Sequence, residues 1–258
     1  MQKALALQPD QRTAPSNGTK WLAQLERSIR IKTRKFRRPR VISIDGIRLE
    51  VDRSRLPSGI VRALYRERYE DKEAALVREV LMPGDRVLEI GAGIGFVTLL
   101  CARRCGPEAV LSYEANPENE ALIRRNFELN GLFPQLRVRA ISVESDEREL
   151  FVAKNLLSTS FIDRGESTGT QVQCDAIGEV VERFRPNSIV MDVEGAEIDL
   201  LPAAPMAGIA KIIVETHPHI VGEAAIAALD EHLLAKGFVR QRRNLGKVRL
   251  YLRPQSQN

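Results

Sequence analysis

The sequence has little cysteine, no long apolar run and no clear targeting segment. Its three cysteines, Cys101, Cys105 and Cys174, are too few for a disulfide framework. No stretch approaches the roughly 20 apolar residues that span a bilayer, and the N-terminal apolar stretch is too short for a secretory signal. We therefore expect a cytoplasmic protein. A mitochondrial-type transit peptide is the alternative, because the first forty residues are basic and poor in acids.

Acidic residues are scarce at the N-terminus. Residues 1–40 hold eleven Lys and Arg but only two Asp and Glu, a net charge of +9, whereas the remainder of the chain carries −4. Among these cations stand five large apolar residues: Trp21, Leu22, Leu25, Ile29 and Phe36. The pattern favours a short amphipathic basic helix within a flexible arm. Two interpretations stay open: the arm is exposed to solvent without a partner, or it contacts nucleic acid or an anionic surface.

The rest of the chain reads as an α/β fold behind a short N-terminal extension. Asp45-Gly46 between two alternating segments predicts a β-hairpin, and a helical stretch with a break near Tyr69 follows from Ser58 to about Leu81. Strands and helices then alternate, which predicts a mostly parallel sheet with helices on both faces. The expected strands are 86–90, 109–113, 136–141, 188–193 and 209–216; the expected helices are 96–104, 117–130, 176–184 and 223–236.

The chain ends in a different pattern. Residues 238–244 and 247–252 alternate around Leu245-Gly246 and predict a closing antiparallel hairpin. Residues 154–171 read as a polar loop that we expect to shape a ligand pocket together with the N-terminal hairpin. We divide the chain into a basic arm (1–40), a hairpin and helical extension (41–82) and a main α/β domain (83–254).

Three glycines stand between a buried strand and a helix. Gly91, Gly93 and Gly95 follow Glu89 in the pattern acid-x-G-x-G-x-G, and the Lys and Ser/Thr of a Walker A loop are missing. Glycine allows a sharp turn and a close approach of a ligand to the backbone. Glu114 ends the next strand, 19 residues after Gly95. An acid at that place binds ribose hydroxyls and repels a 2′-phosphate, so the pattern predicts a nucleoside site.

Several segments resemble the FkbM family of class I S-adenosylmethionine (SAM) methyltransferases. Residues 89–95 fit the family's first motif, residues 113–131 are similar to its second-strand region, and "MDVEGAEIDLL" (191–201) matches its most distinctive block. Residues 68–85 resemble the helix that precedes the first strand. The likeness covers roughly residues 65 to 220. Ala115 departs from the proline usual in the family, and Ala92-Gly93 departs from Ala-Asn.

The resemblance implies a Rossmann-like fold, a seven-stranded sheet with an antiparallel last strand, and SAM as cofactor. It implies methyl transfer to a hydroxyl of a small molecule or glycan. An RNA methyltransferase that uses the basic arm is the main alternative, and a binding module that has kept the cofactor fold is a third reading. The residues expected to contact the cofactor are Tyr69, Glu70, Glu89, Gly91, Ala92, Gly93, Gly95, Phe96, Glu114, Ala115, Asn116 and Asp192.

A hydroxyl that accepts a methyl group must lose a proton, and the candidate bases lie at the ends of the fourth and fifth strands. Asp192, Glu194 and Glu197 follow the fourth strand, where helix capping is the alternative role of the two glutamates. His217 follows the fifth strand and shares a face with Glu215, which we expect to orient it. We expect no metal, since Asp192, His217 and His219 are too few ligands.

Overall fold

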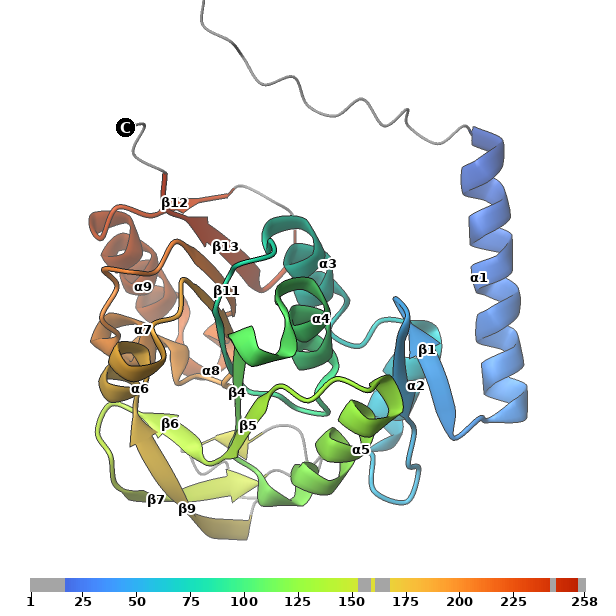
Figure 1. Cartoon of the computed structure of the whole chain (residues 1–258), viewed down its shortest axis with the longest axis horizontal. Helices are drawn as coiled ribbons and strands as arrows, with labels where there is room; N and C mark the ends of the chain where they lie inside the picture. The colour runs from blue at the N-terminus through green and yellow to red at the C-terminus, as the bar shows by residue number, and fades with distance from the viewer. Residues whose placement is uncertain (1–16, 153–158, 161–167, 242–244, 255–258) are drawn as a thin grey trace, which may run out of the picture. The chain divides into compact units, whose positions relative to one another are not determined.

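The computed structural model describes residues 17–152, 159–160, 168–241 and 245–254 (Figure 1). The chain divides into two compact units, Met1–Pro39 and Arg40–Asn258. The first unit contains the helix α1 (Asn17–Arg37), so the basic arm forms a longer helix than the pattern of residues 21–40 suggested. Among the described residues, no helix is both long enough and apolar enough to cross a membrane.

The second unit begins with the predicted hairpin. The strands β1 (Val41–Ile44) and β2 (Ile47–Glu50) pair antiparallel. The backbone of Asp45 and Gly46 between them is left-handed at both positions, as a tight hairpin turn requires. The predicted helical stretch is broken near Tyr69 as expected, into α2 (Ser58–Arg66) and α3 (Asp71–Val80).

The central sheet has seven strands in the order β12-β13-β11-β10-β3-β4-β5 (Figure 1). The four neighbouring pairs from β11 to β5 are parallel, and β13 runs antiparallel to both β11 and β12. The predicted fold class is therefore confirmed. The strands are β3 (Val87–Ile90), β4 (Val110–Glu114), β5 (Gln135–Val138), β10 (Ser188–Met191), β11 (Lys211–Glu215), β12 (Val239–Arg240) and β13 (Val248–Leu252).

Helices cover both faces of this sheet and bury a core on each. One core contains residues of α2, α3, α4 (Phe96–Cys105) and α5 (Glu120–Asn130) together with the hairpin. The other contains residues of α6 (Ile177–Phe184), α7 (Glu197–Ala203) and α9 (Glu223–Ala235). Side chains of β3 alternate between the two cores, with Val87 in the first and Leu88 in the second. Three short helices complete the fold: η1 (Pro107–Ala109), η2 (Pro117–Asn119) and α8 (Pro218–Val221).

A second, four-stranded sheet was not predicted. Its order is β6-β9-β7-β8, formed by β6 (Ala140–Ser142), β7 (Glu147–Val152), β8 (Thr159–Ser160) and β9 (Thr168–Ala176). The expected strand 136–141 is thus divided, since Gln135–Val138 joins the central sheet and Ala140–Ser142 the other. Part of the expected loop 154–171 is strand, because polar Thr-rich segments also pair through their backbones. The remainder of that loop lies outside the described residues.

Strand order places the glycine turn at the centre of the sheet. β3 lies between β4, which follows it in the chain, and β10, which comes after the second sheet. The chain therefore continues from β3 to β4 on one side and from β10 to β11 on the other, so the strand order reverses between β3 and β10. In open α/β sheets, ligands bind beyond the carboxyl ends of the strands at such a reversal. The turn after β3 and the residues after β10 and β11 meet there.

Candidate active site

The backbone of the glycine turn lies against the neighbouring strand end. All three glycines have left-handed φ angles, +96° at Gly91, +57° at Gly93 and +80° at Gly95. A Cβ atom on Gly91 would lie 1.9 Å from the carbonyl oxygen of Asp192, so no side chain fits there. A Cβ atom on Gly95 would come within 3.1 Å of Ile123 and Phe127 of α5. Glycine is thus required for the close packing of the turn between β10 and α5.

Glu114 lies beside this turn, buried at the end of β4. Its Oε2 atom accepts a hydrogen bond from the backbone N–H of Gly93 at 2.8 Å. Its Oε1 atom accepts from the N–H of Asn116 at 2.9 Å and from Nδ2 of Asn119 at 3.1 Å. Burial raises the pKa of Glu114, and these three donors oppose the rise. A carboxylate has about four acceptor sites, so one is left for a ligand hydroxyl such as that of a ribose.

The segment between α2 and α3 lies on the turn. A Cβ atom on Gly93 would be 2.7 Å from the Tyr69 hydroxyl and 3.3 Å from Oε1 of Glu70. The Tyr69 ring also packs against Phe96 with the ring centroids 6.4 Å apart. Left-handed backbone at Glu67 and Glu70 makes the chain turn on both sides of Tyr69. Tyr69 and Glu70 thus lie next to Gly93, and their contact with the cofactor stays a prediction.

The other predicted cofactor contacts face inward in this structure. Phe96 is fully buried, and the side chain of Asn116 accepts a hydrogen bond from the N–H of Glu118 at the start of η2. The N–H of Ala92 donates to the carbonyl of Tyr113, which ties the turn to β4. Ala115 packs against the small core of the second sheet.

Glu89 is buried beneath the turn. Its Oε2 atom accepts hydrogen bonds from the hydroxyls of Ser112 and Thr98. Burial raises the pKa of Glu89 to about 7, although both hydroxyls favour the charged form. A cavity of about 10 Å³, roughly the space of one water, lies between Glu89, Glu70, Glu73 and Asp192. Four carboxyl groups thus face one small space beside Gly91.

The raised pKa of Glu89 makes a testable prediction about stability. The folded state keeps the proton up to about pH 7, whereas the unfolded chain loses it near the ordinary value of 4.5. Stability should therefore fall as the pH rises between these values, by about 3 kcal/mol from this group. Glu89→Gln removes that loss, so the variant should exceed the wild type in urea unfolding at about pH 8 and match it more closely at about pH 5. An equal difference at both pH values would contradict this account.

Two carboxylates, Asp192 after β10 and Glu197 at the start of α7, flank the imidazole of His217 after β11. The His217 side chain is 4% exposed, and its Nε2 atom lies 3.5 Å from Oδ1 of Asp192. On the other side of the ring, Nδ1 lies 3.4 Å from Oε1 of Glu197. Glu197 is fully buried and accepts hydrogen bonds from the N–H of His217 at 2.7 Å and of Gly195 at 2.8 Å. The imidazole is thus held between two carboxylates.

A carboxylate other than the predicted Glu215 also lies beside His217. Glu197 lies against the Nδ1 side of the ring and is oriented by two backbone donors. Glu215 offers an oxygen within 4.8 Å of a ring nitrogen of His217, so its role in orienting the ring stays a prediction. Glu194 is also near, with Oε2 3.9 Å from Nε2 of His217. The alternation along a strand put Glu215 and His217 on one face. It could not show that Glu197 comes to the same place from the first residue of α7.

The carboxylates control the protonation of this cluster. Burial lowers the pKa of His217, but Glu197, Asp192 and Glu194 outweigh it and raise the pKa above the ordinary 6.5. The partnership with His217 lowers the pKa of Glu197 in spite of burial. Burial and the nearby Glu215 raise the pKa of Asp192. Oδ1 of Asp192 and Nδ1 of His217 are buried, and their nearest partners are Nε2 of His217 at 3.5 Å and Oε1 of Glu197 at 3.4 Å. A proton on each ring nitrogen would thus face a carboxylate oxygen, which favours the charged imidazole.

Asp192, Glu215 and His217 also offer one metal-ligand type atom each, all within 4.8 Å of one another. His219, the third ligand considered from the sequence, is not in this group; its Nδ1 atom lies 3.3 Å from Nζ of Lys247. A proton on His217 would neutralise part of the negative charge of Asp192 and Glu215, and a bound cation would do the same. These three residues are compatible with both arrangements, so a site without metal stays a prediction.

The sequence analysis missed two residues of the site. Nδ2 of Asn119 donates a hydrogen bond to Glu114. Glu73 is a buried acid of α3, and burial raises its pKa to about 7. Glu73 lies among buried Ala74, Leu76 and Val77, which form the apolar face of that helix. A lone acid on an apolar helical face is the signal that could have identified it.

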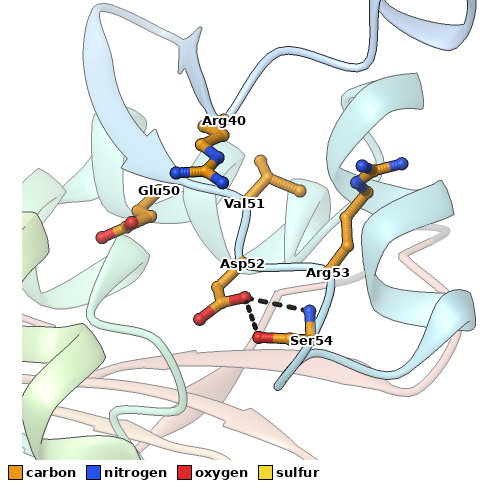
Figure 2. A pocket seen from close by; sticks show the side chains of 6 residues that line it. All are labelled: Arg40, Glu50, Val51, Asp52, Arg53 and Ser54. Carbon is orange, nitrogen blue, oxygen red and sulfur yellow. Dashed lines mark hydrogen bonds between the residues drawn. The ribbon is translucent and has the colours of Figure 1, made fainter.

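A larger hollow lies elsewhere, beside the end of β2 (Figure 2). Its volume is about 320 Å³, and it is lined by Arg40, Glu50, Val51, Asp52, Arg53 and Ser54. The carboxylate of Asp52 accepts hydrogen bonds from the N–H and the hydroxyl of Ser54, which lower its pKa. These contacts close a local turn. None of the predicted site residues lines this hollow, so its size does not make it the active site.

Comparison with known proteins identifies the family. Residues 89–253 match the Methyltransferase FkbM domain. No curated protein sequence matches the chain. Among solved structures, it is similar to a SAM-dependent O-methyltransferase from Thermotoga maritima, with 16% identity, a TM-score of 0.43 and 78% of this chain and 73% of that one covered.

Two further structures show similar likeness. A putative tRNA (m1A22) methyltransferase from Streptococcus pneumoniae in complex with SAM has 14% identity and a TM-score of 0.42, covering 72% of this chain and 74% of that one. A precorrin-6y C5,15-methyltransferase from Geobacter metallireducens has 12% identity and a TM-score of 0.43, with 80% and 94% covered. The domain match spans more than half of the residues, and the chain therefore belongs to the FkbM family of methyltransferases, whose methyl donor is S-adenosylmethionine.

Proposed function

We propose that the protein transfers a methyl group from SAM to a hydroxyl of a small molecule or glycan in the cytoplasm. The supporting observation is the buried imidazole of His217, held between Asp192 and Glu197 beside the glycine turn. A hydroxyl loses its proton as it accepts the methyl group, and a histidine whose pKa is raised above 6.5 is a suitable base. We assign catalysis to His217 together with the carboxylates of Asp192, Glu194 and Glu215, which lie near its ring.

The residues around the turn fit the cofactor. Glu114 has an acceptor site for a ribose hydroxyl, and the glycine backbone leaves no Cβ atom in the way. The bound cofactor supplies an electrophilic methyl group on a positively charged sulfur. Four carboxyl groups, those of Glu70, Glu73, Glu89 and Asp192, line the small cavity beside Gly91. Burial raises their pKa values, and a cation bound nearby would favour their ionised forms.

The chain's own contribution is orientation and proton removal. Holding the acceptor in line with the methyl group supplies about 7–11 kcal/mol. His217 takes the acceptor proton, and Glu197 fixes its ring through Nδ1. Glu197 is a positioning residue, because it touches His217 and the backbone of Gly195 in the interior.

Replacing Glu114 with Gln is expected to weaken SAM binding about 10- to 100-fold, the effect of losing a hydrogen bond to a charged group. Gly93 donates to one carboxylate oxygen and Asn116 to the other, so the N–H₂ group of Gln faces one of these two backbone donors and the turn loses part of its anchor. Isothermal titration of the folded variant with SAM and with S-adenosylhomocysteine measures the change. The exposed Glu118→Gln is the matched control and should bind as the wild type does. Equal affinity in both variants would remove Glu114 from the cofactor site.

RNA is the alternative acceptor, and the net charge of +9 on residues 1–40 favours it. The two proposals separate in one experiment. Purified protein and SAM are incubated with a cell extract divided into an RNA fraction and a fraction of small molecules and glycans. Mass spectrometry then identifies which fraction contains a species that has gained one methyl group. Methylation confined to RNA, and lost when residues 1–40 are deleted, would replace the hydroxyl proposal.

A further inference from the structure

Helix α1 carries a continuous apolar face. Trp21, Leu22, Leu25, Ile29 and Phe36 are each 43–88% exposed, although large apolar residues are usually buried. At about 100° per residue, all five fall within an arc of about 100° around the helix axis. We call these five residues the apolar stripe of α1. Scattered exposed apolar residues need no explanation, but five on one helix face indicate a binding surface.

The rest of the helix is strongly basic. Seven Lys and Arg and a single Glu lie within Asn17–Arg37, a net charge of +6, and six of the seven cations remain when the buried Arg34 is set aside. Lys32 falls inside the arc of the stripe, where its long stem can lie along apolar groups while the ammonium reaches water. Every other cation lies outside the arc. The helix therefore offers an apolar face bordered by positive charge.

We propose that α1 lies in the plane of an anionic lipid surface, with the apolar stripe inserted among the acyl chains. Such a surface satisfies both properties of the helix, since it takes up apolar side chains and attracts cations. The cytoplasmic leaflet is anionic, which agrees with the expected compartment. Aromatic residues near the two ends, Trp21 and Phe36, suit the boundary between headgroups and acyl chains.

Two other partners fit the helix less well. An RNA backbone would pair with the cations, but it would leave the five apolar side chains in water. A second copy of α1 could cover the stripe, but it would bring two helices of charge +6 side by side. Only the lipid surface uses both the stripe and the charge.

The chain contains a single tryptophan, and it lies in the stripe. Tryptophan emission from the full-length protein therefore reports on this face directly. We expect a blue shift on addition of phosphatidylcholine vesicles that contain phosphatidylglycerol. Binding to vesicles of phosphatidylcholine alone should be weaker by more than about tenfold, and high salt should reduce the difference.

Two pairs of substitutions test the stripe at equal charge. Leu25→Asp with Ile29→Asp places two acids on the stripe, and should abolish the blue shift and vesicle co-sedimentation. Gln24→Asp with Ser28→Asp makes the same change in charge one residue earlier in each case, outside the arc, and should retain most of the binding. Circular dichroism of both variants checks that the helix content is equal.

Three results would overturn the proposal. Trp21 emission that is already blue without lipid and unchanged by vesicles would mean that protein covers the stripe, and sedimentation would show whether a second copy does so. Equal loss of vesicle binding in both variant pairs would mean that charge alone is responsible. Salt-sensitive binding of an RNA oligonucleotide without any vesicle binding would assign the helix to RNA.

Discussion

Gly91→Ala is expected to destabilise the fold strongly and to abolish SAM binding. The added Cβ atom would lie 1.9 Å from the backbone oxygen of Asp192, and a backbone atom cannot rotate away as a side chain can. The left-handed φ of +96° costs about 1–3 kcal/mol for a residue other than glycine. Overpacking adds about 1–3 kcal/mol more. The total is a large part of the roughly 5–15 kcal/mol that holds a domain folded.

Gly178→Ala is the matched control for this substitution. A Cβ atom on Gly178 meets nothing within 4 Å, and the residue lies in the first turn of α6. Alanine there should leave SAM binding unchanged and stabilise the fold by about 0.5–1 kcal/mol. Urea unfolding and titration with SAM compare the two variants. If Gly91→Ala binds SAM with wild-type affinity, the close contact between the turn and β10 is not required for the site.

His217→Ala is expected to lower turnover by about 10²–10⁴-fold, the contribution of a positioned base. SAM affinity should stay near that of the wild type, because His217 is assigned to the acceptor proton. The measurement is formation of S-adenosylhomocysteine with the methylated fraction of the extract, alongside titration with SAM. His219→Ala is the control, since the His219 ring packs beside that of His217, with centroids 5.8 Å apart, but its nitrogens lie outside the group of Asp192, Glu215 and His217. An unchanged rate in His217→Ala would exclude it as the base.

The pH dependence of the reaction gives an independent check of the same proposal. A base must be deprotonated, so kcat/KM should rise with pH through the pKa of His217, which lies above 6.5. Glu197→Gln removes the carboxylate beside Nδ1 and should move this rise to lower pH. A purely structural role of Glu197 would lower the rate without moving the profile. Loss of activity on chelation, with recovery on adding Mg²⁺, would instead make His217 a metal ligand.

Much of the fold followed from local patterns in the sequence. The hairpin at Asp45-Gly46, the break near Tyr69 and the strand before Gly91 were all predicted because turn residues and periodicity mark them. The second sheet was not, because β9 is a polar segment whose pairing with β7 and β6 is decided by partners distant in the sequence.

The candidate site likewise contains features that local sequence patterns predicted and contacts that they did not. Glycine spacing and the position of Glu114 are local signals, and the structure places both at the reversal of strand order. The contact between Glu197 and His217 joins the start of α7 to the end of β11. Spacing along one strand carries no information about such a contact, so the sequence suggested Glu215 as the partner. Glu73 was overlooked because it comes from a helix before the first strand of the central sheet.

The placement of Tyr69 and Glu70 over Gly93 has a consequence for the rate of the catalytic cycle. If the nucleoside binds against the backbone of Gly93, the Tyr69 phenol and the Glu70 carboxyl that lie on the turn must move before it can enter or leave. Glu67 and Glu70, which precede and follow Tyr69, both have left-handed backbone, and such a displacement would rotate the chain about these two residues. The spent, demethylated nucleoside would then have a long residence time, and its departure rather than methyl transfer would set the turnover number.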